Sequence, residues 1–130
     1  MFTGIIEELG EIRLITTNKI KIVCKNILDT IQLGDSIAVN GGCLTVTDVG
    51  KDYFYADISP ETIKITTFAN SKVGDLVNLE RAMKADGRFD GHIVSGHIDT
   101  KGKCLDVTKI EKFCVIKIEL TNEYTKYIDL

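Results

Sequence analysis

The stretch Phe2-Thr3-Gly4-Ile5-Ile6, with Gly10 further on, recurs as Val94-Ser95-Gly96-His97-Ile98, with Gly102 at the same interval. A repeat with so long a separation indicates two copies of one compact domain, and it argues against a solenoid of short units. The repeated stretch therefore decides the architecture, because it divides the chain into a first unit and the start of a second.

The second copy follows the first for only part of its length. Continuing the alignment places Ile20–Cys24 over Cys114–Ile118 and carries Leu33 onto Leu130. The stretch after Gly34, which includes a central run rich in β-branched residues, has no counterpart in the second copy. We therefore expect the second unit to contain only the opening strands of the fold.

The first copy reads as a series of short strands with one helix. Ser59 suits a helix N-cap, Pro60 suits the first turn, and the helical stretch is predicted for Thr62–Thr66. Short antiparallel strands in under ninety residues favour a small closed barrel, which leaves no exposed edge. The predicted strands, bounded by Gly, Asp or Asn, are Lys19–Cys24, Ser36–Asn40, Leu44–Val49, Tyr53–Ile58 and Leu76–Arg81.

Composition narrows the class of protein. Hydrophobic residues make up 44% of the chain, charged residues 27%, and the formal net charge is -3. These values predict a globular protein, and no basic stripe argues for a nucleic-acid partner. We find no apolar run of bilayer length and no leader-like segment, so we expect no membrane attachment and a cytoplasmic location.

The four cysteines and two histidines show no metal-ligand spacing. Cys24, Cys104 and Cys114 lie in apolar or alternating runs, where cysteine usually acts as a small buried hydrophobe. Cys43 differs because it follows two glycines, where backbone can approach a ligand closely, although context alone favours a structural role. The odd spacing of His92 and His97 points them to opposite faces of an extended segment, so we expect no metal site.

Five motifs in order give a more specific indication. Together they resemble the alpha chain of riboflavin synthase, a family of lumazine-binding barrels, and the resemblance spans all 130 residues. The motifs are Met1–Glu7, Asn40–Val46, Pro60–Thr62, Val73–Glu80 and Gly91–His97.

The resemblance implies an all-β fold, with a six-stranded antiparallel Greek-key barrel and one short helix in residues 1–86. Residues 87–130 would then supply the linker and the opening strands of a second, incomplete barrel. The implied reaction is a dismutation of two 6,7-dimethyl-8-ribityllumazine molecules to riboflavin and 5-amino-6-ribitylamino-2,4-pyrimidinedione, without metal or other cofactor. The family also implies a homo-oligomer, a trimer for full subunits, and we expect a dimer of first barrels for this chain.

The family's ligand contacts can be carried over by position. The resemblance implies catalytic roles for Cys43, Thr45 and His97, with His97 moving a proton near neutral pH. For Asp57, Ser59 and Glu61, side-chain and backbone contacts remain alternatives, and Thr45 and Asp57 also suit purely structural roles. The implied substrate-binding residues are Gly4, Ile5, Ile6, Cys43, Leu44, Thr45, Asp57, Ile58, Ser59, Pro60, Glu61, Thr62, Gly96, His97 and Ile98.

A non-catalytic lumazine- or riboflavin-binding module is the alternative function, because the second barrel is expected to be incomplete. Lumazine-binding relatives of that kind tend to lack the reactive residues at the positions of Cys43 and His97. Both residues are present in this chain, which favours an enzyme.

Overall fold

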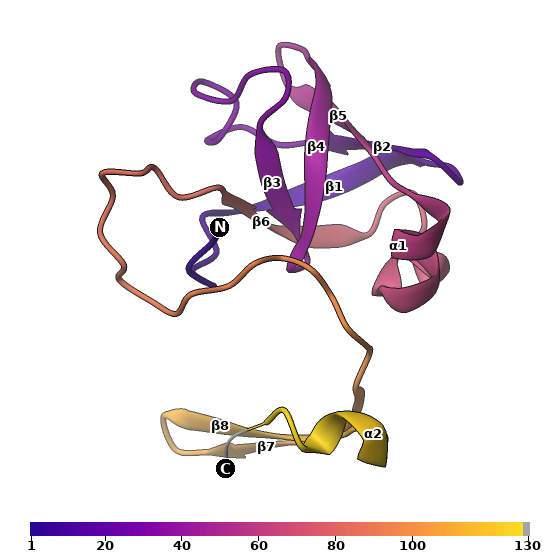
Figure 1. Ribbon diagram of the computed structural model, residues 1–130, viewed down its shortest axis with the longest axis vertical. Helices are drawn as coiled ribbons and strands as arrows, with labels where there is room; N and C mark the ends of the chain where they lie inside the picture. The colour runs from indigo at the N-terminus through magenta and orange to yellow at the C-terminus, as the bar shows by residue number, and fades with distance from the viewer. Residues whose placement is uncertain (129–130) are drawn as a thin grey trace. The chain divides into compact units, whose positions relative to one another are not determined.

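The computed structural model describes residues 1–128, which fall into two units. The first unit is Met1–Ile98, and the second begins at Asp99. The first unit holds a barrel with a short helix, and the second holds a two-stranded hairpin (Figure 1).

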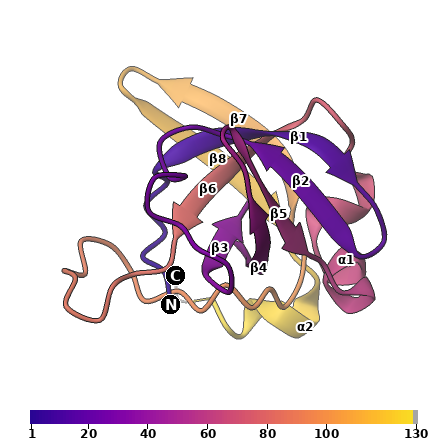
Figure 2. The ribbon, with the colours of Figure 1, turned by 90° about the horizontal axis from the view of Figure 1, so that it is seen from above.

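Six antiparallel strands close the barrel of the first unit in the order β1-β2-β5-β4-β3-β6 (Figure 2). This confirms the predicted all-β barrel, and its non-sequential strand order is that of a Greek key. Closure leaves no sheet edge unpaired, which is how a small β domain avoids exposing an edge strand. The strands are β1 (Glu8–Ile15), β2 (Lys19–Val23), β3 (Ser36–Val39), β4 (Gly42–Val49), β5 (Tyr53–Asp57) and β6 (Leu76–Arg81).

Strand alternation sets the barrel interior. Along β4, Leu44 and Val46 are buried in the core cluster, while Thr45 between them is exposed. The same alternation on β5 buries Phe54 and Ala56. Residues with odd numbers at the start of β4 therefore face outward, which decides where Cys43 and Thr45 point.

The β3–β4 connection is a two-residue hairpin. Val39 pairs with Gly42, and the two loop residues have positive φ, 47° for Asn40 and 83° for Gly41. Two consecutive left-handed residues define a type I′ turn, for which Asn-Gly is the preferred sequence. This tight turn fixes the register in which Cys43 lies opposite Ala38.

The predicted helix is confirmed, with slightly different bounds. Helix α1 spans Pro60–Ile65, and the hydroxyl of its N-cap Ser59 accepts the Thr62 amide at 3.0 Å. A short 3-10 helix, η1 (Thr67–Asn70), follows and buries Phe68 in the core. The pair α1 and η1 connects β5 to β6 outside the strands (Figure 1).

The second unit consists of β7 (Lys103–Ile110), β8 (Phe113–Glu119) and the short helix α2 (Asn122–Thr125). Its hairpin repeats the β1–β2 pair in detail. In each copy a bulge follows one cross-strand pair, Ile12 with Ile22 in the first and Cys104 with Ile118 in the second. A Cβ built on Gly10 or on Gly102 would lie 2.5 Å from Cγ2 of Ile22 or Ile118, respectively.

These equivalences correct the sequence alignment of the second strand. Ile22 corresponds to Ile118, so Ile20–Cys24 matches residues 116–120 and not the predicted Cys114–Ile118. The difference arises because the β7–β8 ladder extends further, to the pair Ile110 with Phe113, before the chain turns.

All the residues of β7 and β8 are exposed, which is a second correction. Cys104 and Cys114 were predicted to be buried, but only Cys24 among the three is buried. The reason is that Cys24 belongs to the closed barrel, whereas the β7–β8 sheet has two strands. Two strands alone do not enclose a core.

The predicted linker, Ala82–Asp90, contains no strand or helix. The chain beyond it, residues 91–98, belongs to the first unit, so the boundary between the two units falls after Ile98. The division into domains at residue 86 stays a prediction. Within residues 1–128, no helix is long and apolar enough to cross a membrane.

Candidate functional site

Cys43 and Thr45 lie on the outer face of β4, two residues apart. Cys43 is half-buried and Thr45 is exposed. Thr45 pairs with Asp57 on β5, and directly opposed residues share a face of the sheet. The structure therefore brings three of the predicted site residues onto one patch of the barrel surface.

Gly96 packs directly on this patch. Its carbonyl oxygen accepts the Cys43 amide at 2.9 Å, and a Cβ added to Gly96 would lie 2.8 Å from the Cβ of Cys43. Gly96 also has a φ of 80°, which disfavours every residue with a side chain. Close approach and a left-handed backbone together explain why glycine occupies this position.

After Gly96 the chain runs beside the turn of the β3–β4 hairpin. Ile98 packs there, with Cδ1 3.9 Å from a Cβ built on Gly41 and Cγ1 3.9 Å from one built on Gly42. His97, between Gly96 and Ile98, is exposed, and its amide is bound by the hydroxyl of Ser95 at 3.1 Å. The predicted trio Gly96, His97 and Ile98 is thus held beside Cys43 by backbone and apolar contacts.

The segment from Asp57 to Thr62 joins the end of β5 to helix α1. The Ser59 and Thr62 hydroxyls lie 2.9 Å apart and are hydrogen-bonded to each other. Ser59, Pro60 and Glu61 are exposed, whereas the Ile58 side chain is buried in the barrel core. Leu44 is buried in the same core, so only the backbone of Leu44 and Ile58 remains for a ligand contact.

Gly4, Ile5 and Ile6 form a separate exposed group near the chain start. Phe2, just before them, pairs with Val94 through amide-to-carbonyl bonds of 2.7 and 3.0 Å. A Cβ built on Gly4 would lie 3.9 Å from Cγ2 of Val94, and Ile5 packs beside Gly91. The structure therefore places this trio by the 91–94 segment, and not in the group around Cys43.

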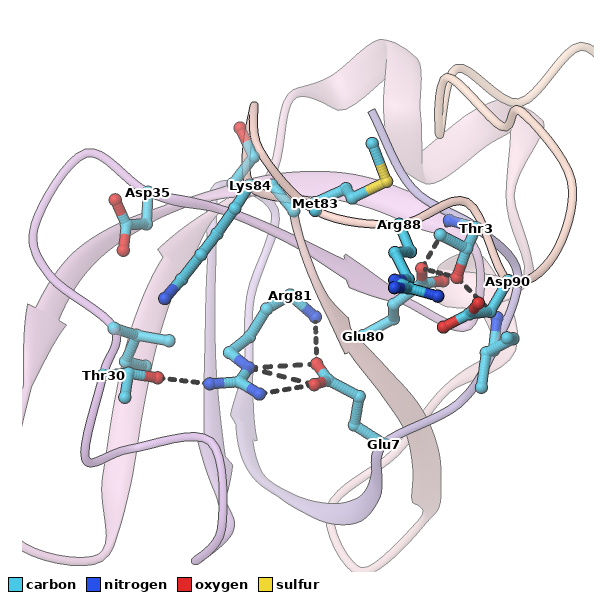
Figure 3. A pocket seen from close by; sticks show the side chains of 15 residues that line it. Thr3, Glu7, Thr30, Asp35, Glu80, Arg81, Met83, Lys84, Arg88 and Asp90 are labelled. Atoms are coloured by element: carbon cyan, nitrogen blue, oxygen red, sulfur yellow. Dashed lines mark hydrogen bonds and ion pairs between the residues drawn. The ribbon is translucent and has the colours of Figure 1, made fainter.

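A cavity of about 630 Å³ lies in the first unit between the chain start, the end of β6 and the linker (Figure 3). Of the predicted site residues, only Ile5 lines it. Arg81 donates to both carboxylate oxygens of Glu7 and to the Thr30 hydroxyl across its floor. The hydrogen bond from Arg81 lowers the pKa of Glu7, and the same pairing raises the pKa of Arg81.

Sequence reasoning missed Glu80, a buried carboxylate at the edge of this cavity. It is only 5% exposed and accepts hydrogen bonds from Thr3 and Gly4. Strand alternation places a glutamate at this position on the outer, solvent-facing side of the barrel. In the sequence, only the repeat of the chain start indicates a segment that could cover it.

The described part of the chain offers no group of three His, Cys, Asp or Glu side chains that could share a metal ion. The Cys43 patch instead presents the Cys43 thiol, the Thr45 hydroxyl and the Asp57 carboxylate, with Gly96 and the apolar Ile98 beside them. Such a surface suits a flat heterocycle with carbonyl and imide edges.

Comparison with known proteins gives a consistent result. A sequence model of the family described as Lumazine binding domain matches residues 3–82. The riboflavin synthase of Bacillus subtilis (strain 168) is 51% identical over 116 residues, which cover 86% of this chain and 53% of that protein. The riboflavin synthase of Actinobacillus pleuropneumoniae is 45% identical over 132 residues, which cover 98% of this chain and 61% of that protein. This chain therefore spans just over half to three fifths of the length of these relatives.

Solved structures give the same fold. The crystal structure of LumP complexed with riboflavin superposes with a TM-score of 0.87 at 30% identity, covering 98% of this chain and 72% of that one. LumP complexed with 6,7-dimethyl-8-(1'-D-ribityl) lumazine gives a TM-score of 0.85 at 29% identity, covering 95% and 71%.

Proposed function

Because this chain belongs to the lumazine-binding domain family, we propose that its barrel binds 6,7-dimethyl-8-ribityllumazine in a riboflavin synthase reaction. The observation that carries the proposal is the contact of Gly96 with Cys43, which holds His97 and Ile98 beside β4. In this proposal residues 1–86 are the lumazine-binding barrel and residues 87–130 are the linker and opening strands of a second one.

The reaction transfers a four-carbon unit from one lumazine to another. The donor and acceptor become 5-amino-6-ribitylamino-2,4-pyrimidinedione and riboflavin. A proton must leave the C7 methyl group of one lumazine, a nucleophile must add to the ring of the other, and the two rings must lie face to face. Alignment of two bound rings is the largest contribution, about 7–11 kcal/mol of barrier, and acid–base groups add about a hundredfold to ten-thousandfold.

We assign to the Cys43 patch and its neighbours the roles that the family resemblance implies. The Cys43 thiol and Thr45 hydroxyl contact the pteridine ring from β4, and His97 exchanges the proton of the methyl group. The Asp57–Thr62 segment binds the pyrimidine edge and the ribityl chain through Thr62 and backbone amides. The exposed position of His97 leaves its imidazole accessible to a ligand on this face.

Gly4, Ile5 and Ile6 are assigned to a second site. They are the repeat equivalents of Gly96, His97 and Ile98, and Gly4 has a left-handed φ of 84° beside the 80° of Gly96. Gly4 contacts no β4 residue, so its group is free to meet the β4 equivalent of another barrel. With this assignment, these residues provide the contacts for the second lumazine that the reaction needs.

Association of copies follows from this assignment. Ile5 and Ile6 are 48% and 44% exposed, which is apolar surface suited to a second barrel. We expect a homo-oligomer, a dimer for this chain, detectable by sedimentation equilibrium as twice the 14.4 kDa chain mass. Monomer at all concentrations would contradict this part of the proposal. A cytoplasmic location is also part of the proposal.

A binding module without turnover is the second candidate. Its support is the similarity to LumP, whose solved complexes contain 6,7-dimethyl-8-ribityllumazine, riboflavin or flavin mononucleotide. The discriminating measurement is formation of riboflavin when the purified chain is incubated with the lumazine. Binding without product supports the module, and product at an enzyme-like rate supports the synthase.

Fluorescence titration with 6,7-dimethyl-8-ribityllumazine tests the site itself. Thr62→Ala and Ser59→Ala both remove the hydrogen bond between the two hydroxyls, but only the first removes the hydroxyl assigned to the ligand. We expect weaker binding in Thr62→Ala alone. Equal loss in both variants would assign the effect to the start of helix α1, and no binding by the unmodified chain would overturn the proposed function.

A further inference from the structure

Glu80 is a buried carboxylate whose place in β6 points it outward. Val77 and Leu79 face the core, so alternation puts Glu80 on the outer surface of the barrel, yet it is only 5% exposed. The chain start covers it. Its Oε1 accepts the Thr3 amide at 2.5 Å and the Thr3 hydroxyl at 2.8 Å (Figure 3), and its Oε2 accepts the Gly4 amide at 3.0 Å.

Glu80 lies in one row with Cys43. Ala38 on β3 pairs with Glu80 on one side and with Cys43 on the other, so the three residues share one face. Ala38 is 4% exposed and Phe2 1% exposed, yet neither belongs to the core cluster inside the barrel. Both are therefore buried on the outside, beneath or within the segments that cross this row.

The covering segments link Glu80 to Cys43 by direct contacts. Thr3 and Gly4 are bound to Glu80, and Phe2 next to them pairs with Val94 in both directions. The Phe2 ring lies 2.9 Å from a Cβ built on Gly96, and the Gly96 carbonyl accepts the Cys43 amide. Each step is a hydrogen bond or a contact with no intervening gap.

We propose that Glu80 is a positioning residue for the Cys43 site: it anchors the chain start, and through Phe2 and Val94 it holds Gly96–Ile98 against β4. The proposal rests on the proposed function, because it matters for activity only if His97 and Ile98 contact the ligand. Glu80 itself has no role in the chemistry.

The chemistry of the anchor requires a carboxylate. Three donors converge on two oxygens, and an ionised carboxylate has acceptors only. Glutamine at this position turns one acceptor into an NH2 donor, which faces either Gly4 or Thr3, so at least one donor loses its partner. Bonds to an ionised acceptor are also about twice as strong as neutral ones.

Glu80→Gln is the test, with Glu8→Gln as the matched control. Glu8 is also a carboxylate that accepts three bonds, from the amides of Lys25, Asn26 and Ile27 in the loop after β2. For Glu80→Gln we expect about tenfold faster hydrogen exchange at the Val94 and Cys43 amides, and about tenfold weaker lumazine binding. For Glu8→Gln we expect faster exchange at residues 25–27 alone and unchanged affinity.

All variants are compared at a temperature where each is fully folded by circular dichroism. Unchanged exchange at Cys43 and Val94 in Glu80→Gln overturns the proposal, and so does an equal loss of affinity in both variants. The exchange measurement needs no ligand, so it tests the anchor even when the proposed function fails. Should Glu80→Gln not fold, Thr3→Val removes one of the three donors and is expected to give a smaller change of the same pattern, or to refute the proposal by giving none.

Discussion

Replacing Gly96 by alanine should loosen the contact that defines the candidate site. The new Cβ would lie 2.8 Å from the Cβ of Cys43 and 2.9 Å from Cε2 of the Phe2 ring. Distances this short force a shift of backbone, because the Cys43 Cβ cannot rotate away. The left-handed φ of 80° at Gly96 adds a second penalty that is independent of the clash.

The two penalties can be separated by a matched variant. Gly74 has a φ of 95°, and nothing lies within 4 Å of a Cβ built on it. Gly74→Ala therefore carries only the backbone penalty, about 1–2 kcal/mol. Gly96→Ala adds overpacking, about 1–3 kcal/mol, so we expect a total cost of about 2–5 kcal/mol at the Gly96 contact.

Urea unfolding and amide exchange measure this cost in complementary ways. If the 94–98 segment of Gly96→Ala stays bound and strains the barrel, the unfolding midpoint falls below that of Gly74→Ala at unchanged m-value. Where the segment detaches, the Cys43 amide loses its acceptor and exchanges more than tenfold faster. A variant with the midpoint of Gly74→Ala and with wild-type exchange at Cys43 would refute the packing argument.

Three further substitutions have expected outcomes in urea unfolding. Thr47 has a buried hydroxyl with no hydrogen-bond partner among the described residues, so Thr47→Val should raise the free energy of unfolding by about 1 kcal/mol; a lower midpoint would contradict this. Burial raises the pKa of the Cys24 thiol from 9.0 to about 12. The unfolded thiol therefore loses its proton first, and stability should fall as pH rises above 9. Cys24→Ala should flatten that slope, and an identical slope would count against the buried thiol. The pKa of Glu7 is lowered from 4.5 by its bond from Arg81. Its contribution is therefore present above pH 4.5 and lost as pH falls through the folded pKa. Glu7→Gln should cost less than about 1 kcal/mol at pH 7, because the pair is partly exposed, and progressively less as the pH falls through the lowered pKa of Glu7; a cost that does not fall on acidification would exclude the ion pair as its source.

Much of the barrel could be predicted because its signals are local. Period-two alternation locates the strands, and the Asn40-Gly41 pair produces the I′ turn that fixes the β3–β4 register. Ser59 caps helix α1 as predicted, since a serine before proline marks a helix start. Each of these features depends on residues within a few positions of one another.

The register of the second hairpin could not be predicted for an equally definite reason. The alignment error at β8 is two residues, and a shift of two leaves every side chain on the same face. Apolar pattern therefore cannot detect it. The bulges after Ile12 and Cys104 fix the alignment, and a bulge depends on hydrogen bonding that the sequence pattern does not display.

The candidate site was predictable only in part. Two glycines before Cys43 indicate close backbone approach, but the partner that approaches, Gly96, lies in a segment beyond the linker. Burial of Glu80 likewise depends on Thr3, which is remote in sequence. Contacts between segments so far apart carry no local periodicity, so only the family resemblance linked Gly96 with Cys43, and nothing linked Glu80 with Thr3.

The repeat explains why the two copies of one sequence motif have different neighbours in the fold. Phe2 and Val94 occupy the same position in the two copies, and they face each other across an antiparallel bridge. Such a bridge has local two-fold symmetry, so the residues that follow it leave in opposite directions. Gly96 therefore reaches Cys43, while Gly4, with the same left-handed backbone, lies by Val94 and is bound to Glu80. In the proposed function, the group around Gly96 and the group around Gly4 each contact one of the two lumazines.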